Sequence, residues 1–367
     1  EFTWSNDLSL LDKTTDKGID FEKKLLYSPN TIGLGKVKGN TTVTINGGKV
    51  HKDVYGGGNK GQVDGNTTVN ISGDVDISTV YAGCNQSDVA GSSTLNINAS
   101  EKFTITNAFG GNNASGNIGS VFVNVGSGSI TNLYGGGNKA NDTFDTVTTI
   151  TGGSITNVFG GGKNASVGNI TLSTTGATIN TIFGGGDQAD VLGNINLQIG
   201  DTSINNLYGG NNQTGSISGK VSVTVNNPKL ITNLYGGGNL AGNEYDVDVT
   251  VTNGYITNLF GGGKKASVGS IKLLLLDGSA TNVYGGGDEG ATLGNITVDS
   301  SIDVETLYGG ANKANVDGAI EVYIKDGAYT NIFGGNNENG AISGNVSLVF
   351  TGGSTTYLYG GGNKAND

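Results

Sequence analysis

Several residue types are missing or scarce in this 367-residue chain, and each absence removes a class of chemistry. There is no Arg and no Met, and His51, Cys84 and Trp4 are the single residues of their types. Without Arg, the chain cannot hold a phosphate or carboxylate in a bidentate guanidinium fork. One Cys and one His cannot form a zinc site, and a Ser-His-Asp triad would have to use His51. We expect His51 to lie at the surface and Cys84 to be a small buried side chain.

Positive charge and long hydrophobic runs are also scarce. The 31 acidic residues outnumber the 20 basic residues and give a formal net charge of -11. Because nucleic-acid binding depends on neutralising phosphates, we expect no nucleic-acid partner. The longest apolar run, from Ile271 to Leu276, is interrupted by Lys272. It is far shorter than the ~20 residues of a transmembrane helix, so we expect no membrane insertion.

Glycine, in contrast, is abundant, with 67 Gly against 2 Pro. Collagen is excluded because Gly does not occupy every third position. A disordered chain is disfavoured because 35% of the residues are apolar and regularly spaced. An apolar residue, an aromatic residue and a Gly-rich turn recur thirteen times, at steps of 24 to 28 residues. A period of this length is typical of solenoids.

The alternation within each repeat predicts strands, and no helix after residue 40. Val247, Val249 and Val251 alternate with polar residues, which is the period of two that a strand requires. We expect three short strands per coil, with Gly and Asn in the tight turns. The sequence thus predicts an all-β fold, a parallel β-solenoid (β-helix) of about 13 coils with about 25 residues per coil. We expect it to be right-handed, as parallel crossovers almost always are.

Two regions follow from the repeat. Residues 1-38 do not repeat and are rich in apolar side chains, so we expect an N-terminal cap over the first coil. Residues 39-367 form the solenoid and stop in mid-coil without a cap sequence. We therefore expect a fragment of a longer protein, whose open C-terminal edge allows end-to-end self-association.

A longer period is superimposed on the coils. The turn sequence from Gly160 recurs from Gly261, 101 residues later, which indicates duplicated blocks of four coils. One extra coil, around Tyr308, interrupts this order.

The aromatic residue of each repeat marks the same point in every coil. The thirteen positions are Tyr55, Tyr81, Phe109, Tyr134, Phe159, Phe183, Tyr208, Tyr235, Phe260, Tyr284, Tyr308, Phe333 and Tyr359. If each ring follows an inward aliphatic residue, alternation directs it outward, beside flat Gly rows. Such a ladder suits the apolar faces of sugars, so these residues are the candidate ligand-binding site. The alternative is that the rings point inward and stack as core.

An Asn precedes the aromatic residue by two positions in most coils. Stacked amides can form hydrogen bonds along such a row. We therefore expect a structural Asn ladder, and no active site, at Asn107, Asn132, Asn157, Asn206, Asn233, Asn258, Asn282 and Asn331.

Acidic residues on one strand face and in Gly-rich turns are candidates for a metal site. Calcium is the ion that such oxygen ligands suit, and the candidate residues are Asp187, Asp246, Asp248 and Asp288. Calcium takes about six to eight oxygen ligands, and the calcium-binding nonapeptide is not matched. A solvated strand face is the alternative.

The repeat also argues against two further functions. Carboxylate pairs for glycoside hydrolysis recur without a distinct, non-repeating pocket around them, so we expect no enzyme. An ice-binding face would need regular outward Thr residues on the first strand of each coil. Phe122, Val147, Asp248 and Lys272 interrupt that row.

The Tyr/Phe-Gly-Gly-Gly-Asn/Lys/Asp turns with Val-x-Ile-x-Gly-Gly strands resemble the Gly-rich solenoid arrays of large bacterial cell-surface adhesins, over residues 39-367. The resemblance implies an extracellular, non-enzymatic protein displayed on a bacterial cell surface. The expected partner is a glycan or a host or cell-surface protein, bound through the aromatic and Gly face. The alternatives are a passive stalk that displays another domain and, third, a polysaccharide depolymerase.

Overall fold

The computed structural model describes residues 35-140 and 143-364, and every regular element in these ranges is a β-strand. The odd-numbered strands are β1 (Thr41–Ile45), β3 (Thr67–Gly73), β5 (Val89–Ala99), β7 (Ile118–Ser127), β9 (Thr146–Ile150), β11 (Ile170–Thr174), β13 (Ile195–Ile199), β15 (Val221–Asn226), β17 (Val247–Asn253), β19 (Ile271–Leu275), β21 (Ile296–Ser300), β23 (Ile320–Ile324) and β25 (Val346–Phe350). The even-numbered strands are β2 (Gly48–Tyr55), β4 (Val75–Tyr81), β6 (Thr104–Phe109), β8 (Ser129–Tyr134), β10 (Ser154–Phe159), β12 (Thr178–Phe183), β14 (Ser203–Tyr208), β16 (Leu230–Tyr235), β18 (Tyr255–Phe260), β20 (Ser279–Tyr284), β22 (Asp303–Tyr308), β24 (Ala328–Phe333) and β26 (Ser354–Tyr359).

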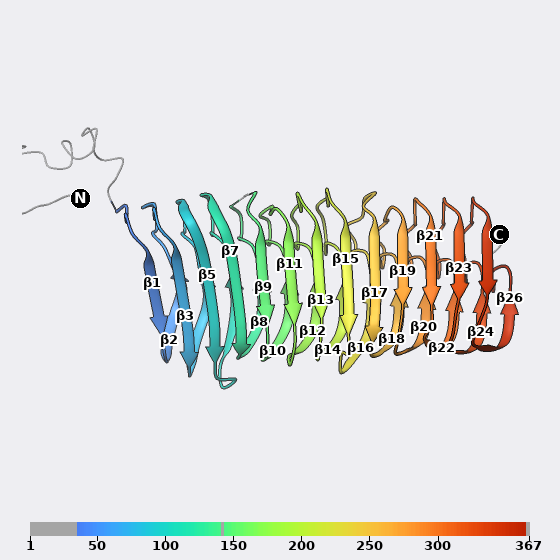
Figure 1. Cartoon of the computed structure of the whole chain (residues 1–367). Coiled ribbons are helices and arrows are strands. Elements are labelled where there is room, and N and C mark those ends of the chain that lie inside the picture. The colour runs from blue at the N-terminus through green and yellow to red at the C-terminus, as the bar shows by residue number, and fades with distance from the viewer. Residues whose placement is uncertain (1–34, 141–142, 365–367) are drawn as a thin grey trace, which may run out of the picture.

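The strands form two 13-stranded parallel sheets that run the length of a row of stacked coils (Figure 1). We call them the odd sheet and the even sheet, after the numbers of their strands. Each strand pairs with the equivalent strand of the next coil, as β17 pairs with β19 through Val247 and Ile271. The predicted all-β parallel solenoid, with about thirteen coils of about 25 residues, is therefore confirmed.

Three strands per coil are not confirmed. The third segment of a coil pairs through single residues, for example Val167 with Val191 and Val191 with Ile217. Bends and turns flank this segment closely on both sides, and isolated bridges take the place of a continuous strand ladder.

The core is a thin column of aliphatic side chains between the sheets. Alternation places Ile170 and Leu172 of β11 and Ile179 and Ile182 of β12 in this column, where each is at most 1% exposed. Burial of such a side chain stabilises the fold by roughly 1.5 to 3 kcal/mol. Because the column is continuous, each coil is stabilised mainly by its two neighbours.

The Gly-rich turns allow adjacent coils to approach closely. A Cβ atom on Gly184 would lie 2.2 Å from the carbonyl oxygen of Gly209 in the next coil. Only glycine fits where another backbone passes at this distance.

Most of the predicted N-terminal cap, including Trp4, lies outside the described residues. Within residues 35-38, Val37 makes a parallel bridge to Val63. At the other end of the solenoid, Tyr357 and Leu358 of β26 are about half exposed. None of the described residues belongs to a helix that is long and apolar enough to cross a membrane.

Candidate functional site

The thirteen aromatic residues of the repeat form one continuous stack along the solenoid. Neighbouring ring centroids lie 4.5 to 5.1 Å apart, and the ring planes deviate from parallel by 4 to 12°. Each interior ring is therefore covered on both faces by its neighbours, at a spacing favourable for aromatic pairs.

Most of this ring column is buried, yet it is separate from the aliphatic core. From Tyr81 to Phe260 its residues are 2 to 6% exposed and form a cluster of their own. The residue before each ring from Tyr55 to Phe333, such as Leu133 before Tyr134, belongs to the core. Alternation thus directs the rings away from the core, and stacking then hides their faces. Their role in ligand binding stays a prediction, and in the interior coils it would have to use ring edges and hydroxyl groups.

A polar row, which we call the turn row, lies four residues after each aromatic residue. Its amides are linked from coil to coil: Asn113 Nδ2 donates to Asn85 Oδ1 at 2.8 Å, and Asn138 Nδ2 donates to Asn113 Oδ1 at 2.8 Å. Lys163 ends this run and Asp187 begins the next, accepting from Asn212 Nδ2 at 2.7 Å. A carboxylate can only accept hydrogen bonds and an ammonium group can only donate them. One run of amide hydrogen bonds can therefore end at a Lys, and a new run can begin at the Asp of the next coil.

The Asn residues two positions before the rings form a second hydrogen-bonded row. Asn132 Nδ2 donates to Asn107 Oδ1 at 3.1 Å, and Asn157 Nδ2 donates to Asn132 Oδ1 at 2.9 Å. The row continues from Asn206 through Asn233 and on to Asn258 and Asn282. In the remaining member, Asn331 Nδ2 donates to Thr306 Oγ1 at 3.4 Å. These contacts join neighbouring coils, and they are hydrogen bonds of the kind that a structural ladder requires.

Burial changes the acidity of the tyrosines in the ring column. It raises the pKa of Tyr284 to about 12, and it raises the pKa of Tyr134 and Tyr235 as well. The nearby carboxylates of Asp187 and Asp288 add to the increase at Tyr134 and Tyr235 respectively. These hydroxyl groups are therefore neutral at physiological pH and available as hydrogen-bond donors.

The four acidic residues considered for calcium are not brought together. Asp187 and Asp288 accept hydrogen bonds from amide side chains of the turn row. Asp246 accepts from the backbone N–H of Ser270, and Asp248 pairs with Lys220. Within the described residues, no three His, Cys, Asp or Glu side chains are grouped so as to hold a metal ion.

The single Cys and the single His do not form part of a site. Cys84 is fully buried, its Sγ accepts from the backbone N–H of Gly58 at 3.3 Å, and burial raises the pKa of the thiol. His51 is exposed on β2.

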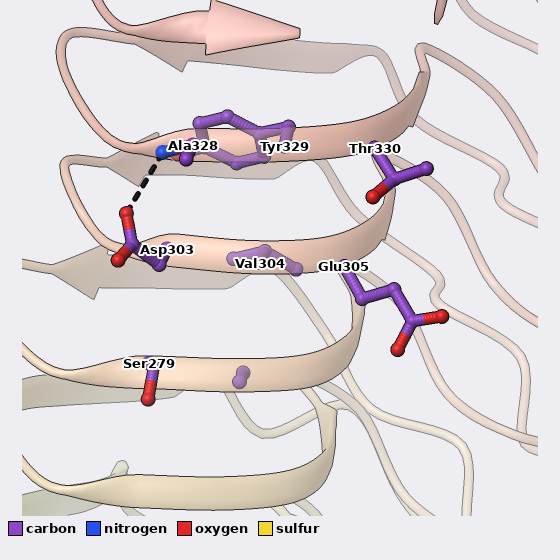
Figure 2. A pocket seen from close by; sticks show the side chains of 8 residues that line it. Ser279, Asp303, Val304, Glu305, Ala328, Tyr329 and Thr330 are labelled. Atoms are coloured by element: carbon purple, nitrogen blue, oxygen red, sulfur yellow. Dashed lines mark hydrogen bonds between the residues drawn. The ribbon is translucent and has the colours of Figure 1, made fainter. Parts of the chain in front are cut away.

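A shallow hollow of about 220 Å³ lies on the outer face of the even sheet, and the sequence analysis missed it. Its lining comes from β20, β22 and β24: Ser279, Ala280, Asp303, Val304, Glu305, Ala328, Tyr329 and Thr330. Figure 2 shows Asp303 and Glu305 at the two ends of the exposed stretch of β22, with Ala328 and Thr330 beside them on β24. Asp303 Oδ1 accepts from the backbone N–H of Ala328 at 2.8 Å, which fixes its carboxylate at the edge of the hollow.

The floor and rim of the hollow depend on small side chains. Ala280 and Val304 stand where earlier coils carry Ile, as at Ile256, and Ser279 leaves space on the outer surface. Tyr329 closes the floor from the inner side, and its hydroxyl lies 2.8 Å from Ser300 Oγ.

One sequence signal does point to this hollow. The even-numbered strands from β6 to β26, all within the described residues, carry two charged side chains, Asp303 and Glu305. Both belong to the coil around Tyr308, the coil that interrupts the four-coil order.

No protein-family model, curated protein or solved structure matches this chain. The resemblance to adhesin arrays stays a prediction, and the function has to be argued from the surfaces of the solenoid.

Proposed function

We propose that this chain is a non-enzymatic, extracellular module of a bacterial cell-surface protein, and that it acts as a rigid elongated spacer. The observation that carries the proposal is continuity. Both sheets and the ring column pass through all thirteen coils of the described residues, so that every coil contacts the next through two sheets and a ring pair. Twelve steps at the ~4.8 Å spacing of β-strands give a rod of about 58 Å.

The ring column fits a spacer better than it fits a surface that binds ligands through the rings. A sugar stacks on an open ring face, whereas the interior ring faces are covered by other rings. A spacer needs what the column supplies, which is a repeated contact between coils that resists bending and shear.

We also infer the finer geometry of the coil. The single-residue bridges of the third segment follow one another along the solenoid, as Val268, Thr292 and Val316 do, which supports a three-sided cross-section. A right-handed winding is expected because parallel crossover connections almost always have that hand. An experimental structure at side-chain resolution tests both statements.

Labelling of intact cells tests the location. Antibodies against the purified chain should bind unbroken cells of the organism that encodes it, and external protease should remove the signal. Labelling that appears only after the cells are lysed would contradict the proposal.

A further inference from the structure

We propose that the outer face of the even sheet binds a neutral linear polysaccharide, with Tyr255 as the platform for one sugar and the hollow at Asp303 and Glu305 as a neighbouring subsite. This inference goes beyond the spacer function and does not rest on it, because a spacer needs no ligand.

Tyr255 is an exposed aromatic ring on a face that is polar apart from this ring and the neighbouring Leu230. It is 43% exposed, and Leu230 on the adjacent strand is 39% exposed. The two side chains are neighbours because Ile231 pairs with Ile256, the residues that follow them. The Tyr255 hydroxyl lies 2.8 Å from Thr281 Oγ1 on β20, which holds the ring across the sheet. A fixed, open ring edged by an aliphatic side chain suits the apolar face of a sugar.

The rows around Tyr255 are uncharged and rich in hydroxyl groups. Apart from Leu230 and Tyr255, the outward residues from β6 to β20 are Thr104, Thr106, Ser129, Thr131, Ser154, Thr156, Thr178, Asn180, Ser203, Asn205, Thr232, Thr257, Ser279 and Thr281. Each Ser and Thr hydroxyl can both donate and accept a hydrogen bond, as the hydroxyl groups of a sugar can.

The hollow lies within reach of the same bound chain. Tyr255, Ser279 and Asp303 follow one another across β18, β20 and β22 in register. Two strand spacings separate Tyr255 from Asp303, which is about 10 Å. The hollow of about 220 Å³ is smaller than the ~300 Å³ at which drug-sized pockets begin, so it fits a single sugar unit.

Charge selects the class of polysaccharide. The carboxylates of Asp303 and Glu305 accept strong hydrogen bonds from sugar hydroxyl groups. They repel an anionic polymer, as does the net charge of -11. The geometry therefore favours a neutral chain over a uronic-acid polymer.

Native affinity electrophoresis of the whole chain provides the test. The gels would contain mixed-linkage β-glucan, xylan or galactomannan, with polygalacturonate as the anionic comparison. The chain should be retarded by at least one neutral polymer and not by polygalacturonate. Tyr255→Ala should weaken that binding by about tenfold or more, because it removes the ring platform.

Two further variants make the result specific. Asp303→Asn with Glu305→Gln keeps the side-chain shapes and an acceptor for Ala328 N–H, yet should also weaken binding. Tyr323→Ala removes a partly exposed tyrosine from the odd sheet and should leave binding unchanged. Circular dichroism confirms that each variant is folded.

Several results would overturn the proposal. They are no retardation by any neutral polymer, retardation that Tyr255→Ala leaves intact, and preferential binding of polygalacturonate. Release of shortened polysaccharide during incubation would show a depolymerase, and would overturn the non-enzymatic account.

Discussion

The side-chain amide of Asn113 donates a hydrogen bond to the hydroxyl of Tyr55 at 3.2 Å, across 58 residues of sequence. The two residues lie two coils apart, since the ring of Tyr81 comes between those of Tyr55 and Phe109. Asn138 likewise forms a hydrogen bond with the hydroxyl of Tyr81. The ring column and the turn row thus form one unit, in which a side chain contacts coils beyond its nearest neighbour.

Removal of one interior ring should destabilise the whole solenoid. Phe159 is 4% exposed and lies 4.6 Å from the ring of Tyr134 and 5.0 Å from that of Phe183. Phe159→Ala should lower the free energy of unfolding by about 3 to 5 kcal/mol, because a cavity opens between two rings. Urea unfolding followed by circular dichroism measures the loss.

Tyr323→Ala is the matched control for the ring variant, because this tyrosine is partly exposed on the odd sheet, where its hydroxyl donates to Glu321. Its effect should stay within about 0.5 kcal/mol. Equal stability of the Phe159→Ala variant and the parent chain would instead favour a binding role for the rings.

Asp187 should be required as a hydrogen-bond acceptor and not as a calcium ligand. It is 7% exposed and accepts from Asn212 Nδ2 and Gln213 Nε2. Asp187→Ala leaves both donors without this acceptor and should cost about 1 to 3 kcal/mol, whereas Asp187→Asn should cost less. Asp201→Ala, at an exposed residue, is the control. A melting temperature that rises on addition of calcium would contradict this role, because a ligand that binds the folded state stabilises it.

Alanine in the Gly-rich turns should have opposite effects at two positions. A Cβ on Gly184 would lie 2.2 Å from the Gly209 carbonyl oxygen, whereas a Cβ on Gly39 meets nothing within 4 Å. Gly184→Ala should therefore separate the coils and cost more than about 3 kcal/mol. Gly39→Ala should change stability by less than about 1 kcal/mol. Similar thermal midpoints for the two variants would show that the coils are not this closely packed.

The solenoid should lose stability at alkaline pH through its buried tyrosines. Burial raises the pKa of Tyr284 and Tyr329 to about 12, from the ordinary tyrosine value of about 10. Between these values the folded chain retains protons that the unfolded chain has lost. This contribution to the free energy of unfolding is thus complete below pH ~10 and is lost as the pH rises towards ~12.

Absorbance of phenolate near 295 nm tests the alkaline prediction. In the folded chain part of the signal should appear later in the titration than in urea, and Tyr329→Phe should remove a late component. Coincident titrations in the two conditions would refute it.

The sequence was sufficient for the fold because its pattern is local. Each strand shows its own alternation, and one aromatic residue such as Phe260 marks each coil, so the number of coils could be counted directly. The third strand of each coil was not confirmed. Ala266 and Val268 alternate as strand residues do, yet only Val268 forms a bridge, because turns lie close on either side.

The surfaces were harder to predict, for two physical reasons. Alternation predicts the direction in which a ring points, but it does not predict which side chains cover the ring. The rings of Tyr134 and Phe159, which belong to neighbouring coils, cover each other. The hollow was missed because Asp303 and Glu305, on either side of Val304, read as a solvated strand face. The hollow beside them exists because the neighbouring coils carry small residues at the adjacent positions. The sequence of a single repeat does not show this.

The distance between the two ends of the odd sheet tests the central claim, that the chain is a straight and rigid spacer. Thr42 on β1 and Ser347 on β25 are exposed and belong to one outward row, twelve strand steps apart. Spin labels on Thr42→Cys and Ser347→Cys, with buried Cys84 replaced by Ala, allow pulsed electron-electron double resonance to measure this distance. The account predicts a single narrow distribution near ~58 Å. A broad distribution, or one centred at a much shorter distance, would contradict it.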